Sequence, residues 1–429
     1  MKFSVYTQGC KVNQYDSDII SREMLSAGFE QAGEGEAPDV VILNSCTVTE
    51  NGDKKALRLS AKLKREYPNS VILLTGCYPQ AFPEEAMQKG TADIVVGNSG
   101  KGDIPKIVSE YLNGGACRCV KENETVFSEP VEFFHSDRTR AFIKIEDGCN
   151  RFCSYCIIPM ARGRVRSRSL ENIAKETHFH ALDGHKEIVL TGINLSCYGS
   201  DIGLSLFDAV KAVSEEPLIE RVRLSSLEPE LLTEEVIEKL AGIEKLCPHF
   251  HLSLQSGCDA TLKRMNRHYT AEEYETIVKN LRSAFPSCSV TTDIMVGFAG
   301  ETKEEFEESL RFAEKIGFAK IHVFTYSMRP GTAAAKMEGH IPDSVKEQRY
   351  KKMVEAAEKM QEKFFVRNLN AVHKMLVEKQ TNPDYINGYT ENYIPLHILG
   401  GQASRHDIVP VKITKVQNGH CEGIITAKV

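Results

Sequence analysis

The chain has 429 residues, of which 41% are hydrophobic and 26% charged, and its formal net charge is −6. This length and composition suit a water-soluble protein with two or three domains, and the negative charge argues against a protein that coats nucleic acid over its whole surface. No apolar run approaches the roughly 20 residues of a membrane span, and the N-terminus lacks the apolar segment of a signal peptide. We therefore predict a cytoplasmic protein with no membrane partner.

The first region, residues 1–113, alternates apolar runs with helical patterns. Helices are predicted at 15–27 and 53–67, and the predicted strands are KFSVYTQG (2–9), DVVILNSC (39–46), SVILLTGC (70–77) and ADIVVGN (92–98). Such apolar runs are typical of buried parallel strands. They predict an N-terminal open α/β sheet domain. Residues 114–140 have weak periodicity and are predicted to be a linker.

The second region, residues 141–370, repeats a strand–helix alternation six times. Helical patterns such as Leu170–Leu182 and Lys303–Ile316 follow the first five strands, and a charged helix at 344–370 ends the region. The predicted strands are AFIKIE (141–146), KEIVLTG (186–192), RVRLSS (221–226), FHLSLQS (250–256), VTTDIMVGF (290–298) and KIHVFTY (320–326). Six such units predict a central partial (β/α)6 barrel, with its functional residues at the C-terminal ends of the strands.

The third region, residues 371–429, no longer alternates between strands and helices. Its short β-like runs are separated by Gly and Asn, and they are HKMLVEKQ, YIPLHIL, DIVPVKITKV and CEGIITAKV. This pattern predicts a small antiparallel β-barrel at the C-terminus. The predicted fold class of the whole chain is α/β, with three domains.

Three of the 13 cysteines, Cys149, Cys153 and Cys156, lie in the stretch CNRFCSYC directly after the first predicted barrel strand. Zinc sites usually have four ligands, commonly as two cysteine pairs, and no second CxxC lies nearby. An iron–sulfur cubane held by only three thiolates leaves one iron open for a cofactor. Three unrelated buried thiols are the alternative, which this spacing makes the weaker hypothesis.

A second set of three cysteines is dispersed along the first region. Cys10, Cys46 and Cys77 end the segments VYTQGC, VVILNSC and VILLTGC, so each follows a predicted strand. The C-terminal ends of parallel strands share one edge of a sheet, where ligands collect. We therefore expect the three thiols to converge on a second three-cysteine cluster site, with three buried core cysteines as the alternative.

The CxxxCxxC loop resembles that of the radical S-adenosylmethionine (radical SAM) superfamily. In that superfamily the open iron binds the amino and carboxylate groups of SAM, and one electron from the cluster cleaves SAM to a 5′-deoxyadenosyl radical. Tyr155 fits the aromatic residue usual before the third cysteine. The resemblance implies that Cys149, Cys153 and Cys156 hold a radical-generating [4Fe-4S] cluster with SAM as the second cofactor.

Over essentially its whole length the chain resembles the methylthiotransferases, and its tail resembles a TRAM domain, an RNA-binding β-barrel. TQGCKVN and NSCTVT are most similar to the branch that acts on N6-threonylcarbamoyladenosine in tRNA. This resemblance implies that Cys10, Cys46 and Cys77 hold a second [4Fe-4S] cluster, which presents sulfur. The radical would remove hydrogen from C2 of the modified adenosine beside the anticodon, and a second SAM would methylate the sulfur. The implied partners are tRNA, an electron donor protein and a sulfur source.

Further site residues are expected at the ends of the later barrel strands. The segments RLSSLEP, LSLQSG and DIMVGFAGET end the third, fourth and fifth strands. The resemblance places SAM contacts in the last segment, although Ala299 stands where the family commonly has proline. The candidate SAM-binding residues are Tyr155, Ser226, Glu228, Gln255, Asp293 and Gly297. Ordinary structural polar groups and a plain strand–helix turn are the alternatives.

A run of arginines follows the cluster loop in the segment ARGRVRSR. If this segment is extended, its four guanidinium groups lie on one side, which suits contacts with RNA phosphates. A solvated charge run is the alternative. The candidate RNA-binding residues are Arg162, Arg164, Arg166 and Arg168.

Three functions are open from the sequence. The first is a radical SAM methylthiotransferase that acts on threonylcarbamoyladenosine in tRNA. The second is a methylthiotransferase or other radical SAM enzyme that acts on isopentenyladenosine in tRNA or on a ribosomal-protein side chain. The third is an RNA-binding protein that uses zinc or iron–sulfur sites only structurally.

Overall fold

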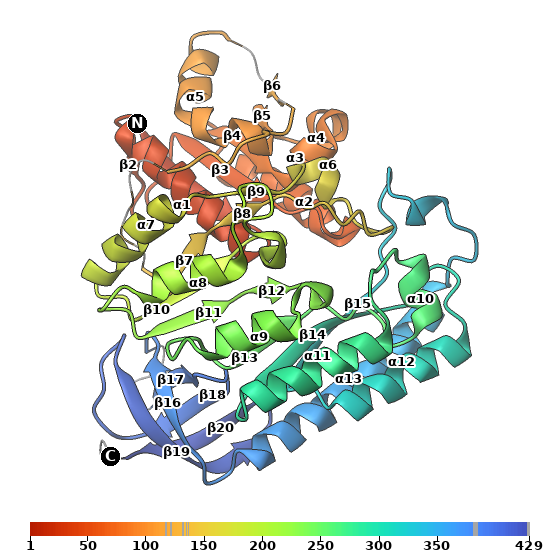
Figure 1. Cartoon of the computed structure of the whole chain (residues 1–429). Coiled ribbons are helices and arrows are strands. Elements are labelled where there is room, and N and C mark those ends of the chain that lie inside the picture. The colour runs from red at the N-terminus through yellow and green to blue at the C-terminus, as the bar shows by residue number, and fades with distance from the viewer. Residues whose placement is uncertain are drawn as a thin grey trace.

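The computed structural model describes residues 1–115, 118–120, 122–130, 133, 135, 137–380 and 385–426. Three assemblies follow one another along the chain (Figure 1). An α/β sheet lies at the top of that view, an open barrel of parallel strands occupies the middle, and a small β-barrel lies at the lower left. This arrangement confirms the predicted fold class, whereas the predicted domain boundaries stay a prediction.

The N-terminal sheet consists of six parallel strands in the order β2-β1-β3-β4-β5-β6. The strands are β1 (Lys2–Thr7), β2 (Glu30–Gln31), β3 (Val40–Ser45), β4 (Val71–Gly76), β5 (Ile94–Val96) and β6 (Arg118–Cys119). The helices are α1 (Lys11–Ser26), α2 (Glu50–Glu66), α3 (Cys77–Ala81), α4 (Pro83–Lys89), the 3-10 helix η1 (Asn98–Asp103) and α5 (Ile104–Leu112). Strand β6 lies within the predicted linker.

Alternate side chains of these strands enter two different cores, because successive strand residues point to opposite faces of a sheet. Val40 and Ile42 pack with Phe3, Ile20 and Met24 on one face. On the other face, Leu43 packs with Leu74 and Tyr78, and Val41 packs with Leu63 and Ile72. Burial on both faces explains why these segments read as continuous apolar runs.

The central barrel has parallel strands in sequence order, in two sheets joined where β11 passes into β12 through Ser225. The strands are β7 (Ala141–Lys144), β10 (Glu187–Thr191), β11 (Arg221–Leu224), β12 (Ser226–Leu227), β13 (His249–Leu252), β14 (Ser289–Val296) and β15 (Lys320–Thr325). No pairing joins β7 to β15 within the described residues. The barrel is therefore partial and has an open seam between these strands.

Helices pack on the outer, apolar face of this barrel, where Ile143, Ile188, Val222, Phe250 and Ile294 belong to one core. The helices are α7 (Leu170–Leu182), α8 (Leu206–Ser214), α9 (Glu234–Ala241), α10 (Asp259–Arg264), α11 (Ala271–Ala284), α12 (Lys303–Ile316) and α13 (Asp343–Arg367). Helices α7 and α12 have the predicted bounds. The described residues of this region also include a small hairpin of β8 (Glu146–Asp147) with β9 (Arg166–Ser167), the short helix α6 (Ile158–Arg162), and the 3-10 helices η2 (Leu195–Cys197), η3 (Pro229–Leu231) and η4 (Ala334–Lys336).

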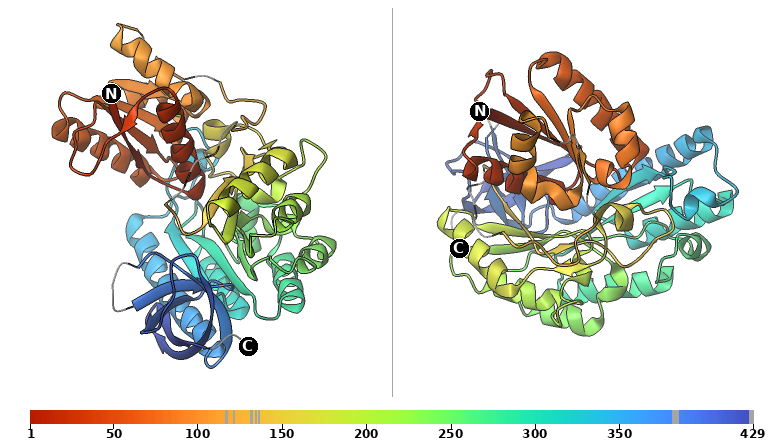
Figure 2. Two further views of the ribbon diagram at one scale, coloured as in Figure 1. Left: turned by 90° about the vertical axis from the view of Figure 1, so that its left-hand side faces the viewer. Right: turned by 90° about the horizontal axis from the view of Figure 1, so that it is seen from above.

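The N-terminal domain bridges the open seam of the partial barrel. On one side, Asp16 of α1 contacts Lys144 of β7 at 2.9 Å. On the other side, Asp53 of α2 pairs with Arg329, which follows β15, and the backbone N–H of Glu50 donates to Ser327 Oγ at 3.1 Å. Figure 2 shows this domain lying over the barrel in both views.

The C-terminal unit is a closed five-stranded barrel in the order β16-β17-β18-β20-β19. Its strands are β16 (Val372–Val377), β17 (Tyr385–Thr390), β18 (Pro395–Leu399), β19 (Ile408–Gln417) and β20 (His420–Ile425). The expected barrel is confirmed, but β18 and β20 pair in parallel rather than antiparallel. Strand β17, with the sequence YINGYT, was not predicted, because its small and polar residues resemble a turn.

Candidate functional site

The loop that carries Cys149, Cys153 and Cys156 lies between β8 and α6 at the barrel mouth. Its backbone is held from several sides: the Cys149 N–H donates to the Gly163 carbonyl at 3.0 Å, and the Cys156 N–H donates to the Cys153 carbonyl at 2.9 Å. A Cβ at Gly148 would lie 1.9 Å from the Arg164 carbonyl oxygen, and Gly148 has a φ of +86°. The loop therefore has little freedom in where it presents its thiols.

Hydrogen-bond donors point at the sulfur atoms of this loop. Cys149 Sγ accepts from the Arg151 backbone N–H at 3.4 Å and from Asn194 Nδ2 at 3.6 Å. Cys153 Sγ accepts from Arg267 Nη1 at 3.2 Å. N–H donors of this kind stabilise thiolate ligands and tune iron–sulfur clusters. The loop thus has the environment that an anionic cluster requires.

The second triad lies at the C-terminal edge of the N-terminal sheet, as the sequence predicts. Cys10 precedes α1, Cys46 follows β3 and Cys77 begins α3, and the three strands before them, β1, β3 and β4, are neighbours. The segments that carry Cys10 and Cys46 lie close together, because a Cβ at Gly9 would lie 2.7 Å from Cys46 Cβ and 3.2 Å from Cys46 Sγ. The structure therefore brings the three segments together at one edge.

The surroundings of Cys77 include a residue from the barrel. Arg162, the last residue of α6, donates from Nε to Cys77 Sγ at 3.3 Å, and Asn98 Nδ2 lies 3.6 Å from the same sulfur. Arg162 also contacts Asp147, two residues before Cys149, at 3.0 Å. One buried guanidinium group thus connects the surroundings of the two triads.

Burial disfavours the thiolate form of Cys46 in one triad and of Cys149 and Cys156 in the other. The pKa of Cys46 is raised to about 12, mainly by burial and secondly by the neighbouring Cys77 thiol. Burial and then the Cys153 thiol raise the pKa of Cys156 to about 12, and burial also raises the pKa of Cys149. All six cysteines are free thiols. Bound iron supplies the positive charge that keeps coordinating thiols deprotonated, so both donor sets fit a cluster.

The candidate SAM-binding residues lie around the barrel mouth, with one exception. Tyr155 packs edge-to-face on Phe298 at 6.2 Å, next to Gly297, whose N–H donates to Glu301. Glu228 is paired with Arg267, the donor to Cys153. Ser226 is exposed. The backbone of Gln255, which has a φ of +65°, forms a parallel bridge with Ile294 of β14. Their contacts with SAM stay a prediction.

Asp293 is the exception, because its side chain lies below the mouth. Its Oδ2 is 3.2 Å from His251 Nε2, and its strand neighbour across β15 is His322. The carboxylate therefore belongs to the polar inner face of the barrel and not to the strand–helix turn that follows β14.

The predicted row of four solvent-facing arginines is wrong for three of its members. Arg162 and Arg166 are buried and pair with Asp147 at 3.0 and 3.6 Å. Arg168 is buried and pairs with Glu176 of α7. Only Arg164 is exposed, over the Phe152 ring at 4.3 Å. The short hairpin and the domain junction cover the other three, so they cannot reach RNA phosphates.

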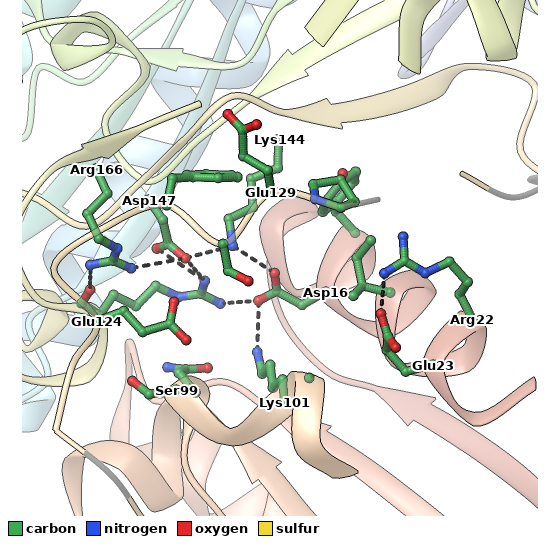
Figure 3. A pocket seen from close by; sticks show the side chains of 18 of the residues that line it. Asp16, Arg22, Glu23, Ser99, Lys101, Glu124, Glu129, Lys144, Asp147 and Arg166 are labelled. Atoms are coloured by element: carbon green, nitrogen blue, oxygen red, sulfur yellow. Dashed lines mark hydrogen bonds and ion pairs between the residues drawn. The ribbon is translucent and has the colours of Figure 1, made fainter. Parts of the chain in front are cut away.

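A pocket of about 380 Å³ lies at the junction of the N-terminal domain and the barrel (Figure 3). The Asp16 carboxylate forms ion pairs with Lys101 at 2.8 Å, with Lys144 at 2.9 Å and with Arg162 at 2.8 Å. Burial acts to raise the pKa of Asp147, but Arg162 and Lys144 outweigh it and lower that pKa to about 2. These buried ion pairs hold the two domains in one arrangement.

Several residues near the thiols were missed by the sequence analysis. Asn194 follows β10, so the strand-end argument applied to the other strands could have found it. Arg267 and Glu146 had no such signal, because Arg267 lies in a loop after α10 and Glu146 lies in an ordinary-looking strand. Glu146 is fully buried and accepts from the Asn194 N–H at 2.8 Å. Desolvation raises its pKa.

Comparisons with known proteins agree with this geometry. Residues 143–313 match the Radical SAM superfamily, and residues 2–97 match the uncharacterized protein family UPF0004. A relative from Thermotoga maritima, named threonylcarbamoyladenosine tRNA methylthiotransferase MtaB, is 39% identical over 95% of this chain and 94% of its own length. A relative of the same name from Bacillus subtilis is 37% identical over 97% of this chain and 95% of its own length.

A third relative bears a different name. It is the tRNA-2-methylthio-N(6)-dimethylallyladenosine synthase of Clostridium tetani, 36% identical over 98% of this chain and 95% of its own length. The barrel, its cysteine loop and the superfamily match define a radical SAM protein. The relatives extend over nearly the whole chain, and the chain belongs to the radical SAM methylthiotransferase family. Membership implies SAM and an iron–sulfur cluster as cofactors.

Solved structures with low sequence identity share the fold. The radical SAM methyltransferase TsrM from Kitasatospora setae, with cobalamin and a [4Fe-4S] cluster bound, is 14% identical, with a TM-score of 0.60 over 90% of this chain and 80% of TsrM. The cobalamin-dependent radical SAM enzyme OxsB has a TM-score of 0.52 over 83% of this chain and 56% of its own, at 14% identity. Among the described helices, none combines the length and apolar character needed to cross a membrane.

Proposed function

We propose that this protein adds a methylthio group to C2 of N6-threonylcarbamoyladenosine beside the anticodon in tRNA. The observation that carries the proposal is the pair of three-thiol sites, one in each α/β unit, which Arg162 connects by contacting Cys77 and Asp147. A radical SAM enzyme with a single cluster would need only the barrel triad. The relatives named for this reaction support the substrate.

The reaction replaces a hydrogen on an aromatic carbon, which has no useful acidity, so general acid–base catalysis is unsuited to it. When bound, SAM and two [4Fe-4S] clusters supply a carbon-centred radical, an iron that holds sulfur, and a methyl group from a second SAM. The chain's own residues position these groups. Asn194, Arg151 and Arg267 donate to the barrel thiols, and Arg162 and Asn98 contact Cys77.

The partners follow from this chemistry. One electron must come from a donor protein, and the added sulfur must come from a separate source. The C-terminal barrel would bind tRNA as a TRAM-like domain over residues 371–429, with residues 1–113 and 141–370 as the other two domains. Arg164 is the one member of the arginine run that is free to contact a phosphate.

The proposal is tested by anaerobic reconstitution with iron and sulfide, followed by reaction with SAM, a strong reductant and tRNA. Mass spectrometry of the nucleosides should show the 2-methylthio derivative of threonylcarbamoyladenosine. Methylthiolation of only isopentenyladenosine would favour the second branch, which relatives of 34–36% identity represent. Modification of a ribosomal-protein side chain, or no reaction with either RNA, would overturn the tRNA proposal.

A further inference from the structure

On strands β13, β14 and β15 the inner face of the partial barrel is mostly polar, in contrast to its apolar outer face. In β13, β14 and β15 the residues Phe250, Val290, Ile294 and Ile321 point outward into the core. Alternate residues of a strand point the opposite way, so the side chains facing inward are His249, His251, Ser289, Thr291, Asp293, Met295, Lys320, His322 and Phe324. We call the space in front of them the lumen.

The strand register arranges these residues in layers. Met295 pairs with Phe324, Asp293 with His322, and Thr291 with Lys320. The strands run toward the mouth, so each layer lies roughly 6–7 Å deeper than the one before it. The upper layer is apolar, with Phe324 46% exposed. In these three strands the two layers below it contain no hydrocarbon side chain.

A hydrogen-bonded chain crosses the lower layers. Thr291 Oγ1 lies 3.0 Å from His251 Nδ1 and 3.3 Å from His249 Nε2, and the other ring nitrogen of His251 contacts Asp293. The His251 and His322 rings lie 5.8 Å apart. The one carboxylate of these layers thus already has a partner within the protein.

One ammonium group reaches the same space. Lys320 is exposed, and its side chain has no hydrogen bond or ion pair with any other described residue. Lys320 and His322 are alternate residues of β15, so both side chains face the lumen. Burial lowers the pKa of His322, Asp293 opposes this, and the charges of His251 and Lys320 lower the pKa further.

We propose that Lys320 and His322 form a subsite for the carboxylate of the threonylcarbamoyl group, below a base held against Phe324. This inference rests on the proposed function and names the residues that select between its two branches. A threonylcarbamoyl group carries a carboxylate, whereas a dimethylallyl group is a hydrocarbon. A hydrocarbon there would desolvate the Lys320 ammonium group without pairing it, which is costly, whereas a carboxylate would form charge-assisted hydrogen bonds.

The experiment measures RNA affinity, without turnover, for the iron-reconstituted full chain with SAM and no reductant. Three anticodon stem–loops carry threonylcarbamoyladenosine, its methyl ester or unmodified adenosine at one position. The variant is Lys320→Met, and the matched control is Lys363→Met, an exposed lysine of α13. The iron content and thermal unfolding of both variants must match those of the unmutated protein, and Lys320 lies far from any cluster cysteine in the sequence.

We expect Lys320→Met to weaken binding of the threonylcarbamoyl RNA roughly ten- to a hundredfold. Binding of the ester and of the unmodified RNA should stay the same, as should all binding by Lys363→Met. An equal loss for all three RNAs would assign the lysine to a backbone phosphate and overturn the subsite. Unchanged binding would also overturn it.

Failure of the proposed function has a different signature. In that case the unmutated protein itself would not distinguish the threonylcarbamoyl RNA from the unmodified RNA, and its methylthio product would form on another substrate. If the unmutated protein makes the expected product and Lys320→Met keeps full discrimination, only the subsite is wrong.

Discussion

The two cysteine triads differ in how the chain assembles them. Cys149, Cys153 and Cys156 share one loop of eight residues, whose local hydrogen bonds place all three thiols. Cys10, Cys46 and Cys77 come from three neighbouring strands, and Arg162 from the other domain reaches one of them. The first triad is local, whereas the second depends on sheet order and domain packing. Changes that leave the fold intact should therefore disturb the two triads unequally.

The largest expected effect comes from breaking the local triad. Cys153→Ala should abolish SAM cleavage, because loss of one of three thiolates removes the cluster, and iron should fall by about four atoms per chain. The measurement is 5′-deoxyadenosine released after addition of a strong reductant. Cys197→Ala is the matched control, since this neighbouring thiol belongs to neither triad. Retained cleavage in Cys153→Ala would contradict the radical SAM assignment of the loop.

Breaking the dispersed triad should separate the two activities. Replacing Cys10, Cys46 and Cys77 together by Ala should eliminate the methylthio product but leave 5′-deoxyadenosine formation, because these residues supply no ligand to the barrel loop. Nucleoside mass spectrometry and 5′-deoxyadenosine assays on the same sample measure both. Folding is checked by thermal unfolding, since a cluster can stabilise the domain that binds it. A folded variant that still methylthiolates tRNA would make these cysteines ordinary core thiols.

The buried arginine between the triads should matter for stability more than its exposed neighbour. Arg162→Met leaves Asp16 and Asp147 with fewer cations in a buried site and should lower the free energy of unfolding by about 3 kcal/mol. Arg164→Met is the matched control and should cost less than about 1 kcal/mol, because its guanidinium is exposed over Phe152. Denaturant unfolding compares them. Equal losses of unfolding free energy in the two variants would mean that Arg162 does not hold the domain junction.

The smallest expected difference between matched variants tests how closely the Cys10 and Cys46 segments approach each other. Gly9→Ala would place a methyl group 2.7 Å from Cys46 Cβ, whereas Gly28→Ala would meet no atom within 4 Å. Both glycines have positive φ, so the backbone strain of about 1 kcal/mol is shared. Gly9→Ala should lower the free energy of unfolding by about 1–3 kcal/mol more than Gly28→Ala does, and it should lower the iron content. Matching stability and iron in the two variants would show that the Cys10 loop can move away from Cys46.

Local pattern predicted most of the fold, because apolar periodicity reflects burial within one element. The bounds of α7 and α12, the six barrel strands and the neighbouring strands before Cys10, Cys46 and Cys77 follow from such patterns. Strand β17 did not, since its YINGYT sequence carries turn-like residues, and its pairing with β16 and β18 comes from barrel closure.

The sequence by itself determined the residue types and spacing of the cysteine loop, and it placed the dispersed cysteines at strand ends. Only the tertiary structure decided that three arginines of one run face buried carboxylates rather than solvent. It also decided that Asp293 of β14 pairs with His251 of β13 on the inner face of the barrel. The physical reason is that charge pairing and solvent exposure depend on which distant segments pack together, and local periodicity carries no information about that packing.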